Sequence, residues 1–518
     1  MKNDNICELV SKVLEYNNCD DVMIEQLYSQ PKNLSTNNSK CVIDAAKRIM
    51  DAKNNREKVF IGGDYDADGI CATTILYDTL LKLDIDTGYY IPDRIKEGYG
   101  LSEKTVDMVY EKGYSLIITV DNGVKSFDAL KKAKEYGIDV IVTDHHEYEE
   151  IPDCKIFVHP KVMENPFKGL CGAGVILQIT KLLLNEVPFH IALASIATIG
   201  DMMELWDENR IIVKLGLVII NTEDYLSINA LFNSYNKSKK TESDISFQVV
   251  PKLNATGRLR ELANPNQVVK YFLLEDKNEI ISVAKNLNEV NEKRKSMTKE
   301  MFAIAEKNIS NDPFIIINDD RFHEGIVGIV ASKIVRDYNR PTLVFTKSEI
   351  GYKGSGRSIL GFDMQSFFQN DFEELIHFGG HNQAVGCTVS FDGFDTFKNK
   401  VQKRYLLSEF DTDIEDDSCV IPCDLINNNS FEKYRELAPF GQGFPNVLFK
   451  ISGLKIKSLT LNRSNFTKVI FENGWQGLCF SDLSNLEFNN TISVYATLTP
   501  SIYKNSSENF SLNIEKIE

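Results

Sequence analysis

The sequence lacks any long hydrophobic run. Its 518 residues contain no stretch of about 18 apolar residues, the length that a membrane-spanning helix requires. Residues 1–9 are too polar to form the apolar core of a signal peptide. These two absences argue against a membrane or secreted protein, and we expect a cytoplasmic location with no membrane partner.

Paired cysteines are also missing. The ten cysteines are scattered, and the closest pair, Cys419 and Cys423, has no matching pair with which it could bind zinc. We therefore expect reduced thiols and no disulfides, as is usual in a reducing compartment.

An excess of positive charge is absent as well. The net charge of −16 argues against the basic face that most nucleic-acid-binding proteins carry. The charge is uneven, however, because residues 446–471 contain no acidic residue and five basic ones, Lys450, Lys455, Lys457, Arg463 and Lys468. Part of the acidic excess also lies in aspartate clusters that bound cations would neutralise. Local charge is therefore a better guide to binding than net charge.

Aspartate-rich motifs are what the sequence does contain, each directly after a β-branched run. The motifs are residues 63–69 (GDYDADG) after 59–61 (VFI), 121–123 (DNG) after 117–120 (IITV), and 144–146 (DHH) after 140–143 (VIVT). Short apolar runs that alternate with helical patterns, such as residues 129–136, predict βαβ units and a parallel sheet. Ligands of such sheets bind beyond the carboxyl ends of the strands, so we expect the three motifs at one edge.

Carboxylates and a neutral imidazole are typical ligands of Mn²⁺ and Mg²⁺. Two such ions about 3.5–4 Å apart can clamp the attacking and leaving oxygens of a phosphoryl transfer. Alternate residues of an extended loop project to one side, so we expect Asp64, Asp66 and Asp68 to face a common centre. One acidic motif alone is more typical of a solvated turn, but three at successive strand ends favour a metal site.

These motifs resemble the DHH phosphoesterase superfamily, and within it the RecJ family of single-strand-specific 5′ exonucleases. The resemblance covers most of residues 40–518. Many members have a histidine where Gly62 stands. The further matching segments are 194–201 (ASIATIGD) and 252–259 (KLNATGRL), followed by three segments of the family's second domain, called DHHA1: 323–332 (HEGIVGIVAS), 354–358 (GSGRS) and 379–386 (GGHNQAVG).

The resemblance implies a set of site residues. Two Mn²⁺ or Mg²⁺ ions would be held by Asp66, Asp68, Asp121, His145 and Asp201, with Asp64 as a further ligand or as a catalytic residue that orients one. His146 would steer the scissile phosphate or protonate the leaving group, and no protein nucleophile is needed. The residues implied to grip phosphate, including a terminal 5′-phosphate, are Arg258, Ser355, Arg357 and His381. Read alone, residues 354–357 predict a tight turn and residues 379–381 a loop. His159, His190 and His377 match no motif, and we expect packing or surface roles for them.

The expected architecture is α/β with several domains, because a chain of this length exceeds one core. Residues 1–57 form a helical lead-in and 58–215 the parallel-sheet DHH catalytic domain. Residues 216–312 form helical connections, with a polar surface loop at 233–244 and a long bridging helix at 280–309, for which a short helical hairpin is the alternative. A second α/β domain, DHHA1, spans 313–407, and an acidic linker occupies 411–417.

Alternating strands at 448–451, 468–471 and 491–495 predict a small all-β barrel over residues 418–518. Residues 439–445 (PFGQGFP) resemble the start of the family's OB-fold, a nucleic-acid-binding domain. Phe466, Trp475 and Phe480 could stack on bases, although core packing is the stronger expectation for any one of them.

The expected function is processive 5′-to-3′ hydrolysis of single-stranded DNA in repair and recombination, by a monomer that works with a helicase or a single-strand-binding protein. One alternative is a DHH phosphodiesterase for short oligonucleotides or cyclic dinucleotides, which would normally lack the Arg258 segment and the barrel. A non-enzymatic scaffold is the other, and degenerate metal motifs would be its signature.

Overall fold

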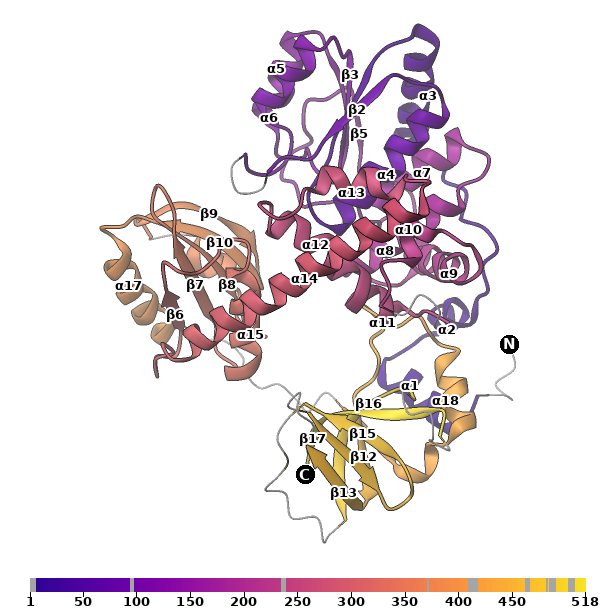
Figure 1. The fold of residues 1–518 in the computed structure, drawn as a ribbon, viewed down its shortest axis with the longest axis vertical. Helices are drawn as coiled ribbons and strands as arrows, with labels where there is room; N and C mark the ends of the chain where they lie inside the picture. The colour runs from indigo at the N-terminus through magenta and orange to yellow at the C-terminus, as the bar shows by residue number, and fades with distance from the viewer. Residues whose placement is uncertain are drawn as a thin grey trace.

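The computed structural model describes residues 6–93, 97–233, 239–369, 372–408, 418–461, 466–480, 483, 491–501 and 508–518. The expected linker at 411–417 and Arg463 lie outside the described residues. Figure 1 shows three bodies: a large α/β body, a smaller lobe joined to it by a long helix, and a β-rich body at the opposite end. Among the described helices, none is both long and apolar enough to cross a membrane.

The large body is built on a parallel five-stranded sheet of order β2-β1-β3-β4-β5, as expected. Its β-branched strands are buried on both faces, which is typical of parallel sheets. Helices α5 and α6 cover one face, and α3, α4 and α7 cover the other (Figure 1). The strands are β1 (Val59–Gly62), β2 (Thr87–Tyr90), β3 (Leu116–Val120), β4 (Asp139–Thr143) and β5 (Ile156–Val158). The helices are α3 (Lys40–Asn55), α4 (Ala67–Lys82), α5 (Glu103–Glu111), α6 (Phe127–Glu135) and α7 (Gly172–Leu183).

A layer of helices follows the sheet and packs beneath it (Figure 1). These are α8 (Pro188–Gly200), α9 (Asp207–Thr222), α10 (Leu226–Asn229), α11 (Glu242–Asp244), a π-helix (Ile245–Val249), α12 (Val250–Arg258) and α13 (Pro265–Phe272). The surface loop predicted at 233–244 is wrong at its end, where α11 begins. Thr241 and Asp244 form a reciprocal capping box there, which satisfies the first backbone amides of the helix.

Helix α14 (Lys277–Glu306) is a single helix of 30 residues, so the bridging-helix prediction is confirmed and the hairpin alternative is wrong. Its first half buries Ile280, Ala284 and Leu287 in the core of the large body. Its last turns bury Met301 and Phe302 in the core of the lobe. The helix therefore ties the two bodies together through apolar contacts at both ends.

The lobe contains a mixed sheet of order β6-β7-β8-β10-β9. Its strands are β6 (Ile315–Asn318), β7 (Thr342–Lys347), β8 (Tyr352–Arg357), β9 (Leu375–His381) and β10 (Ala384–Val389), and its helices are α15 (Val327–Tyr338), α16 (Met364–Phe368) and α17 (Phe394–Leu407). A tight turn at 354–357 and a loop at 379–381, the alternatives to the family's DHHA1 segments, are both excluded because these residues form strands. A Cβ on Gly354 would lie 2.4 Å from the Phe345 ring, so this glycine permits close packing.

The third body is a seven-stranded sheet of order β11-β12-β16-β17-β15-β14-β13. Its strands are β11 (Cys419–Pro422), β12 (Phe449–Leu454), β13 (Ile456–Leu461), β14 (Thr467–Phe471), β15 (Gln476–Cys479), β16 (Ile492–Pro500) and β17 (Phe510–Ile517), and α18 spans Asn428–Arg435. Trp475 is buried in its core as expected. The expectation of core packing is wrong for Phe480, which is 71% exposed. The centroid of its ring lies 6.4 Å from that of Phe466.

The first two helices of the chain belong to this third body. Helix α1 (Glu8–Tyr16) and helix α2 (Asp21–Tyr28) contribute Leu9, Val13 and Leu27 to the same core as Phe449. The sequence carried no signal for this pairing of the two ends of the chain. The amphipathic pattern of a helix shows that it has a buried face but not which partner covers it.

Candidate metal centre and phosphate-binding residues

The first acidic motif crosses from the end of β1 into α4. Asp66 is the N-cap of α4, and its carboxylate accepts a hydrogen bond from Gly69 N at 3.0 Å. Asn254 of α12 accepts a second bond from Ala67 N at 2.8 Å. The predicted extended loop is therefore wrong beyond Asp66. Asp68 lies in the first turn of the helix, since Asp66 and Asn254 satisfy the amides that a helix start leaves open.

Asp68 is 1% exposed, and its charge is stabilised by the start of α7. Its two carboxylate oxygens accept hydrogen bonds from Gly172 N and Ala173 N, each at 2.7 Å. Backbone amides at a helix N-terminus interact favourably with an anion, so the start of α7 fixes the position of the Asp68 carboxylate.

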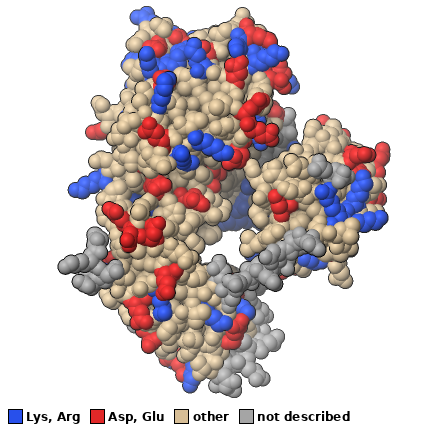
Figure 2. Space-filling model, turned by 180° about the vertical axis from the view of Figure 1, so that it is seen from behind, with Lys and Arg blue, Asp and Glu red and all other residues tan. Residues whose placement is uncertain are grey.

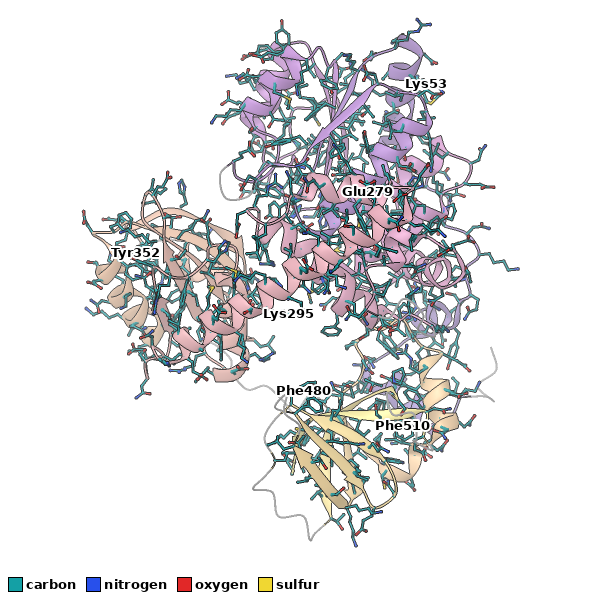
Figure 3. All side chains as sticks on the ribbon, in the orientation of Figure 1. Lys53, Glu279, Lys295, Tyr352, Phe480 and Phe510 are labelled. Atoms are coloured by element: carbon teal, nitrogen blue, oxygen red, sulfur yellow. The ribbon has the colours of Figure 1, made fainter. Side chains whose placement is uncertain are left out.

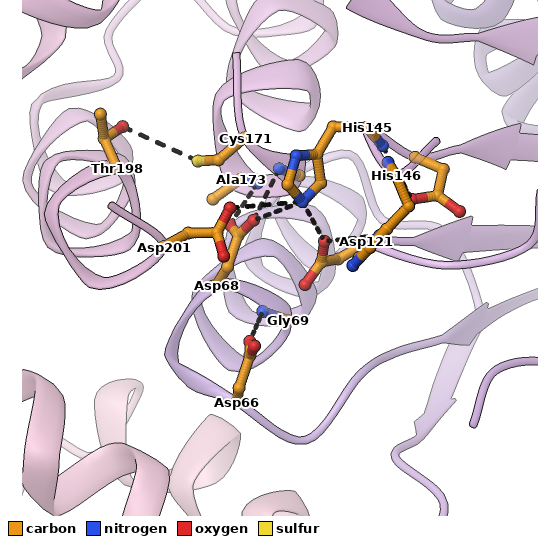
Figure 4. A network of polar contacts seen from close by, with 12 residues as sticks. Asp66, Asp68, Gly69, Asp121, His145, His146, Cys171, Ala173, Thr198 and Asp201 are labelled. Atoms are coloured by element: carbon orange, nitrogen blue, oxygen red, sulfur yellow. Dashed lines mark hydrogen bonds and ion pairs between the residues drawn. The ribbon is translucent and has the colours of Figure 1, made fainter. Parts of the chain in front are cut away.

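His145 is the meeting point of the three motifs and of the end of α8 (Figure 4). Its Nε2 atom lies 3.1 Å from Asp121 Oδ1, 3.4 Å from Asp201 Oδ2 and 3.7 Å from Asp68 Oδ2. Burial lowers the pKa of His145, so the imidazole is neutral at neutral pH and can offer a lone pair. An imidazole nitrogen surrounded by carboxylate oxygens at these distances is the arrangement expected around a shared cation.

The carboxylates of the site repel one another electrostatically. Burial, followed by repulsion from Asp68 and Asp66, raises the pKa of Asp121 well above its usual value and that of Asp201 to about 8. Among the described residues, none forms a well-oriented hydrogen bond with Asp121 Oδ1, although His145 Nε2 lies 3.1 Å away. Buried carboxylates with raised pKa values fit bound divalent cations, which would remove the repulsion.

The ligand atoms separate into neighbouring groups whose members all lie within 4.8 Å of one another. Asp68, His145 and Asp201 form one group, and Asp64, Asp66 and Asp121 form another. Asp121, His145 and His146 form a third, which overlaps both. The expectation that Asp64, Asp66 and Asp68 share one centre is therefore wrong, because the start of α4 turns Asp68 away from the other two. The donors suit two adjacent oxygen-preferring cations.

Asp144 holds His146, a role that the sequence did not reveal. Its Oδ1 atom accepts from His146 Nδ1 at 2.8 Å and from the backbone amide of His145 at 2.7 Å. Burial alone would lower the pKa of His146, but the bond to Asp144 and the surrounding negative charge raise it to about 9. Burial would raise the pKa of Asp144, yet hydrogen bonds from His146 hold it below its usual value. His146 is therefore a cation at neutral pH.

Two of the three unmatched histidines also differ from a simple surface role. His159 is buried, and its Nε2 atom lies 3.0 Å from the backbone oxygen of His146. His190 is buried against Asp78 at 2.8 Å, away from the acidic motifs. His377 is exposed on β9. The packing and surface interpretation is confirmed for His190 and His377, whereas His159 packs directly behind the site.

Helix α12 brings Arg258 beside the metal loop. A Cβ on Gly257 would lie 2.7 Å from Tyr65 O, so the helix backbone touches the first acidic motif. Arg258 Nη1 donates to Gly325 O of the lobe at 3.3 Å. Arg258 therefore stands where the large body meets the lobe.

The remaining candidate phosphate-binding residues lie on the lobe's sheet. Ser355 and Arg357 share one face of β8, with Arg357 Nη1 2.9 Å from Ser355 Oγ. His381 lies on β9, and β10 lies between β9 and β8. Ala384 of β10 is paired with His381 on one side and with Arg357 on the other. The pKa of Glu147, next to His146, is lowered chiefly by its hydrogen bond with Lys161, and His159 and His381 contribute in the same direction.

Lys450 is the member of the basic stretch whose pairing is clearest. Its ammonium group lies 3.0 Å from Glu518 and contacts Tyr495. That charge is therefore partly neutralised within the third body. In Figure 2, lysines, arginines and acidic residues are interspersed over the visible face, and an opening separates the lobe from the third body.

An acidic metal centre at the carboxyl edge of a parallel sheet, joined by a long helix to a second mixed domain, defines a DHH-type phosphoesterase. Three family models match: the DHH family N-terminal domain at residues 58–200, the DHHA1 domain at 311–405 and the RecJ OB domain at 418–516. The chain is 31% identical to the single-stranded-DNA-specific exonuclease RecJ of Haemophilus influenzae over 452 residues, which cover 78% of this chain and 76% of the relative. The chain belongs to the RecJ family.

A second relative is longer than this chain. The Bacillus subtilis RecJ is 36% identical over 445 residues, and the match covers 82% of this chain but only 56% of that relative. The fold resembles that of Thermus thermophilus RecJ in complex with Mn²⁺, with a TM-score of 0.83 at 23% identity, covering 99% of this chain and 76% of the other. A manganese-bound exonuclease RecJ matches with a TM-score of 0.64 at 28% identity over 73% of this chain and 97% of the other.

Proposed function

We propose that this protein degrades single-stranded DNA processively from the 5′ end, as a metal-dependent exonuclease of DNA repair and recombination. The observation that carries the proposal is the convergence of Asp68, Asp121 and Asp201 on His145, within reach of the other predicted acids. We also propose a cytoplasmic monomer that works with a helicase or a single-strand-binding protein. The proposed domains are 58–215, 216–312, 313–407 and 418–518, preceded by a lead-in at 1–57 whose helices α1 and α2 pack on the third body and α3 on the large body.

Two Mn²⁺ or Mg²⁺ ions, when bound, would supply charge neutralisation for the attacking and leaving oxygens of the scissile phosphate. We assign Asp68, His145 and Asp201 to one ion and Asp64, Asp66 and Asp121 to the other, with Asp64 as the ligand or orienting residue at its edge. The neutral imidazole of His145 supports this assignment because only the unprotonated ring can bind a cation.

His146 has a different role from its neighbour. Its raised pKa keeps it protonated, so it can hold a non-bridging phosphate oxygen or donate a proton to the departing 3′-oxygen. Asp144 keeps the ring oriented by accepting from Nδ1, which leaves Nε2 for the substrate. The two adjacent histidines thus divide metal binding and acid catalysis between them.

Recognition of the 5′ end is proposed to come from the lobe. Arg258, Ser355, Arg357 and His381 supply donors on the side of the lobe that faces the third motif. A guanidinium fork suits bidentate binding of a terminal phosphate, which carries more charge than an internal one. Fixing that phosphate at a constant distance from the metals would make cleavage start at the 5′ end.

The third body is proposed to guide the strand. Phe480 is exposed at the end of this body nearest the other two, as Figure 3 shows. An exposed aromatic ring can stack on any base, with a contribution of roughly 1–3 kcal/mol per base. The body would therefore increase the affinity for long strands without selecting a sequence.

The test is a Mn²⁺-dependent digestion of 3′-labelled single strands, with 5′-phosphorylated and blocked ends and with lengths from dinucleotide to long oligonucleotide. We expect progressive shortening of long strands from a free 5′ end, and resistance of blunt duplexes. Activity confined to di- to pentanucleotides would show that the phosphodiesterase alternative is correct.

A further inference from the structure

Tyr99, in the loop that follows β2, extends into the metal site, although it is not one of the proposed metal ligands. Its hydroxyl lies 2.9 Å from the backbone oxygen of Asp121 and 3.1 Å from His146 Nδ1. Its ring packs edge-on against His146 and Tyr65, with centroid distances of 5.6 and 6.5 Å. One side chain therefore touches residues of all three acidic motifs.

The contact to Asp121 is notable because of that residue's backbone. Asp121 has a φ of 62°, in the left-handed region that residues other than glycine seldom adopt. Its amide donates to Thr143 O at 3.0 Å, so its nitrogen remains in the sheet. Its carbonyl is directed instead at the Tyr99 hydroxyl. This unusual conformation is held by one sheet bond and by one side chain from a distant loop.

The direction of the hydrogen bonds follows from the chemistry of the partners. A backbone carbonyl can only accept, so the Tyr99 hydroxyl donates its proton to Asp121 O. The phenolic oxygen then has only lone pairs left, and these face the ring of His146, whose Nδ1 lies 3.1 Å and whose Nε2 lies 3.5 Å away. Asp144 accepts from the same ring at 2.8 Å. His146 Nδ1 carries a single hydrogen, which the shorter contact directs at Asp144. Tyr99 is therefore hydrogen-bonded to Asp121 and in close polar contact with His146.

Asp121 contributes a carboxylate oxygen to two of the three ligand groups. A rotation of its backbone would move that oxygen relative to both. We propose that Tyr99 is a positioning residue, whose hydroxyl fixes the left-handed backbone of Asp121 and thereby the spacing of the metal ligands. The proposal deepens the proposed function and rests on it only for the kinetic part of its test.

The decisive variant is Tyr99→Phe in the full chain, which keeps the ring and removes only the hydroxyl. Mn²⁺ binding is measured without DNA, by titration calorimetry and by the electron paramagnetic resonance signal of free Mn²⁺. We expect affinity at the tighter site to fall about tenfold, the order of effect that changes outside the ligand set produce. We expect kcat on 5′-phosphorylated single strands to fall similarly while KM is unchanged.

Tyr136→Phe is the matched control, because its hydroxyl donates to Asp107 at 2.8 Å on the surface of α6, outside the ligand groups. Melting curves establish that each variant is folded. Tyr99→Leu also removes the ring, which a DNA strand can reach because Tyr99 is 44% exposed. Comparing the two variants separates the role of the ring from that of the hydroxyl. A rise in KM that appears with leucine and not with phenylalanine would assign strand contact to the ring and leave the hydroxyl's role in place.

A folded Tyr99→Phe variant with unchanged Mn²⁺ affinity would overturn the proposal, whatever its activity. Weakened Mn²⁺ binding in a protein whose unmodified form cleaves no DNA would instead refute the proposed function and support the positioning role. The metal-binding measurement therefore separates the two failures.

Discussion

Two regions of this protein bury charge, and they do so in opposite ways. In the metal centre, carboxylates face one another and raise one another's pKa values. At the junction between the large body and the third body, the Arg210 side chain is 1% exposed. Its guanidinium donates to the backbone oxygens of Gln26 and Pro439, each at 3.2 Å, and to that of Leu437.

The oxygens around Arg210 come from segments that are far apart in the chain. Gln26 belongs to α2, and Leu437 and Pro439 lie between α18 and β12 of the third body. Adjacent contacts reinforce the junction, with Leu205 N donating to Gln442 O at 2.9 Å and Trp206 Nε1 to Gly443 O at 3.2 Å. Residues 439–445, which the sequence marked only by resemblance, thus dock the third body onto the large one.

The difference teaches how to distinguish a binding site from a structural junction. Arg210 is buried with its hydrogen-bonding capacity met by the chain itself, so its surroundings require no further ligand. The metal centre is buried with an excess of carboxylates, and bound divalent cations would balance their charge. An unbalanced buried charge therefore indicates function, whereas a balanced one indicates architecture.

His145→Ala tests the unbalanced region and should have the largest effect. The variant removes the nitrogen that three carboxylates surround, so we expect turnover to fall by at least about 1,000-fold, equivalent to several kcal/mol of metal-dependent stabilisation. Strand binding, measured by fluorescence anisotropy, should change little. His377→Ala, on the exposed face of β9, is the control. Full activity of His145→Ala would refute the metal assignment.

Arg210→Met tests the balanced region. The substitution fills similar space but leaves buried carbonyls without donors, so we expect a loss of about 3 kcal/mol in the free energy of unfolding. Because the damage lies at the docking junction, degradation of long strands should suffer more than cleavage of tetranucleotides. Urea unfolding and length-dependent kinetics measure the two effects. Arg336→Met, on the surface of α15, should be neutral, and equal stability of both variants would contradict the junction's role.

The pH dependence of stability should separate the regions further. In the metal-free protein, the raised pKa of Asp201, about 8, means that the folded state binds a proton that the unfolded state has released. His146, with a pKa of about 9, also binds a proton more tightly in the folded state, so it adds to the same loss of stability once the pH exceeds the pKa of a histidine in the unfolded chain. Stability should therefore fall as pH rises from 6 to 8, by up to roughly 1.4 kcal/mol per pH unit for each proton involved.

Saturating Mn²⁺ should reverse that loss. At 100 times its dissociation constant, a ligand of the folded state stabilises it by about 2.7 kcal/mol. Melting temperatures at pH 6 and 8, with and without Mn²⁺, measure both effects. A metal-free protein that is equally stable at both pH values would show that the acidic cluster is less strained than its geometry indicates.

Much of the site could be predicted from the chain because its ligands follow strands. A buried parallel strand has a clear pattern, and the residue after it must lie at the carboxyl edge of the sheet. The three motifs that contain Asp66, Asp121 and His145 were found in this way, whereas the resemblance implied which of their residues bind metal. The strand runs of the third body and the long helix α14 were predicted for a similar reason, since each has a local hydrophobic period.

The errors arose where local pattern and packing disagree. Gly354 and Gly356 are typical of turns, yet they lie in a strand. The Phe345 ring occupies the space of a side chain at Gly354, and Met364 and Val385 occupy it at Gly356. Phe480 has a large apolar side chain, which is typical of a core residue, but it lies on the surface. For the glycines the deciding contacts come from other elements, which no local window contains.

The sequence by itself determined which elements form and which residue types stand at the sheet edge, because both depend on neighbours along the chain. Tertiary structure alone decided that Asp68 groups with His145 and Asp201 rather than with Asp64 and Asp66. It also decided that the Tyr99 hydroxyl contacts the backbone oxygen of Asp121, and that α1 packs in the core of the third body. These arrangements depend on which surfaces meet after folding. That choice is made by burial and hydrogen bonding between segments far apart in sequence, so it leaves no periodic signal in the chain.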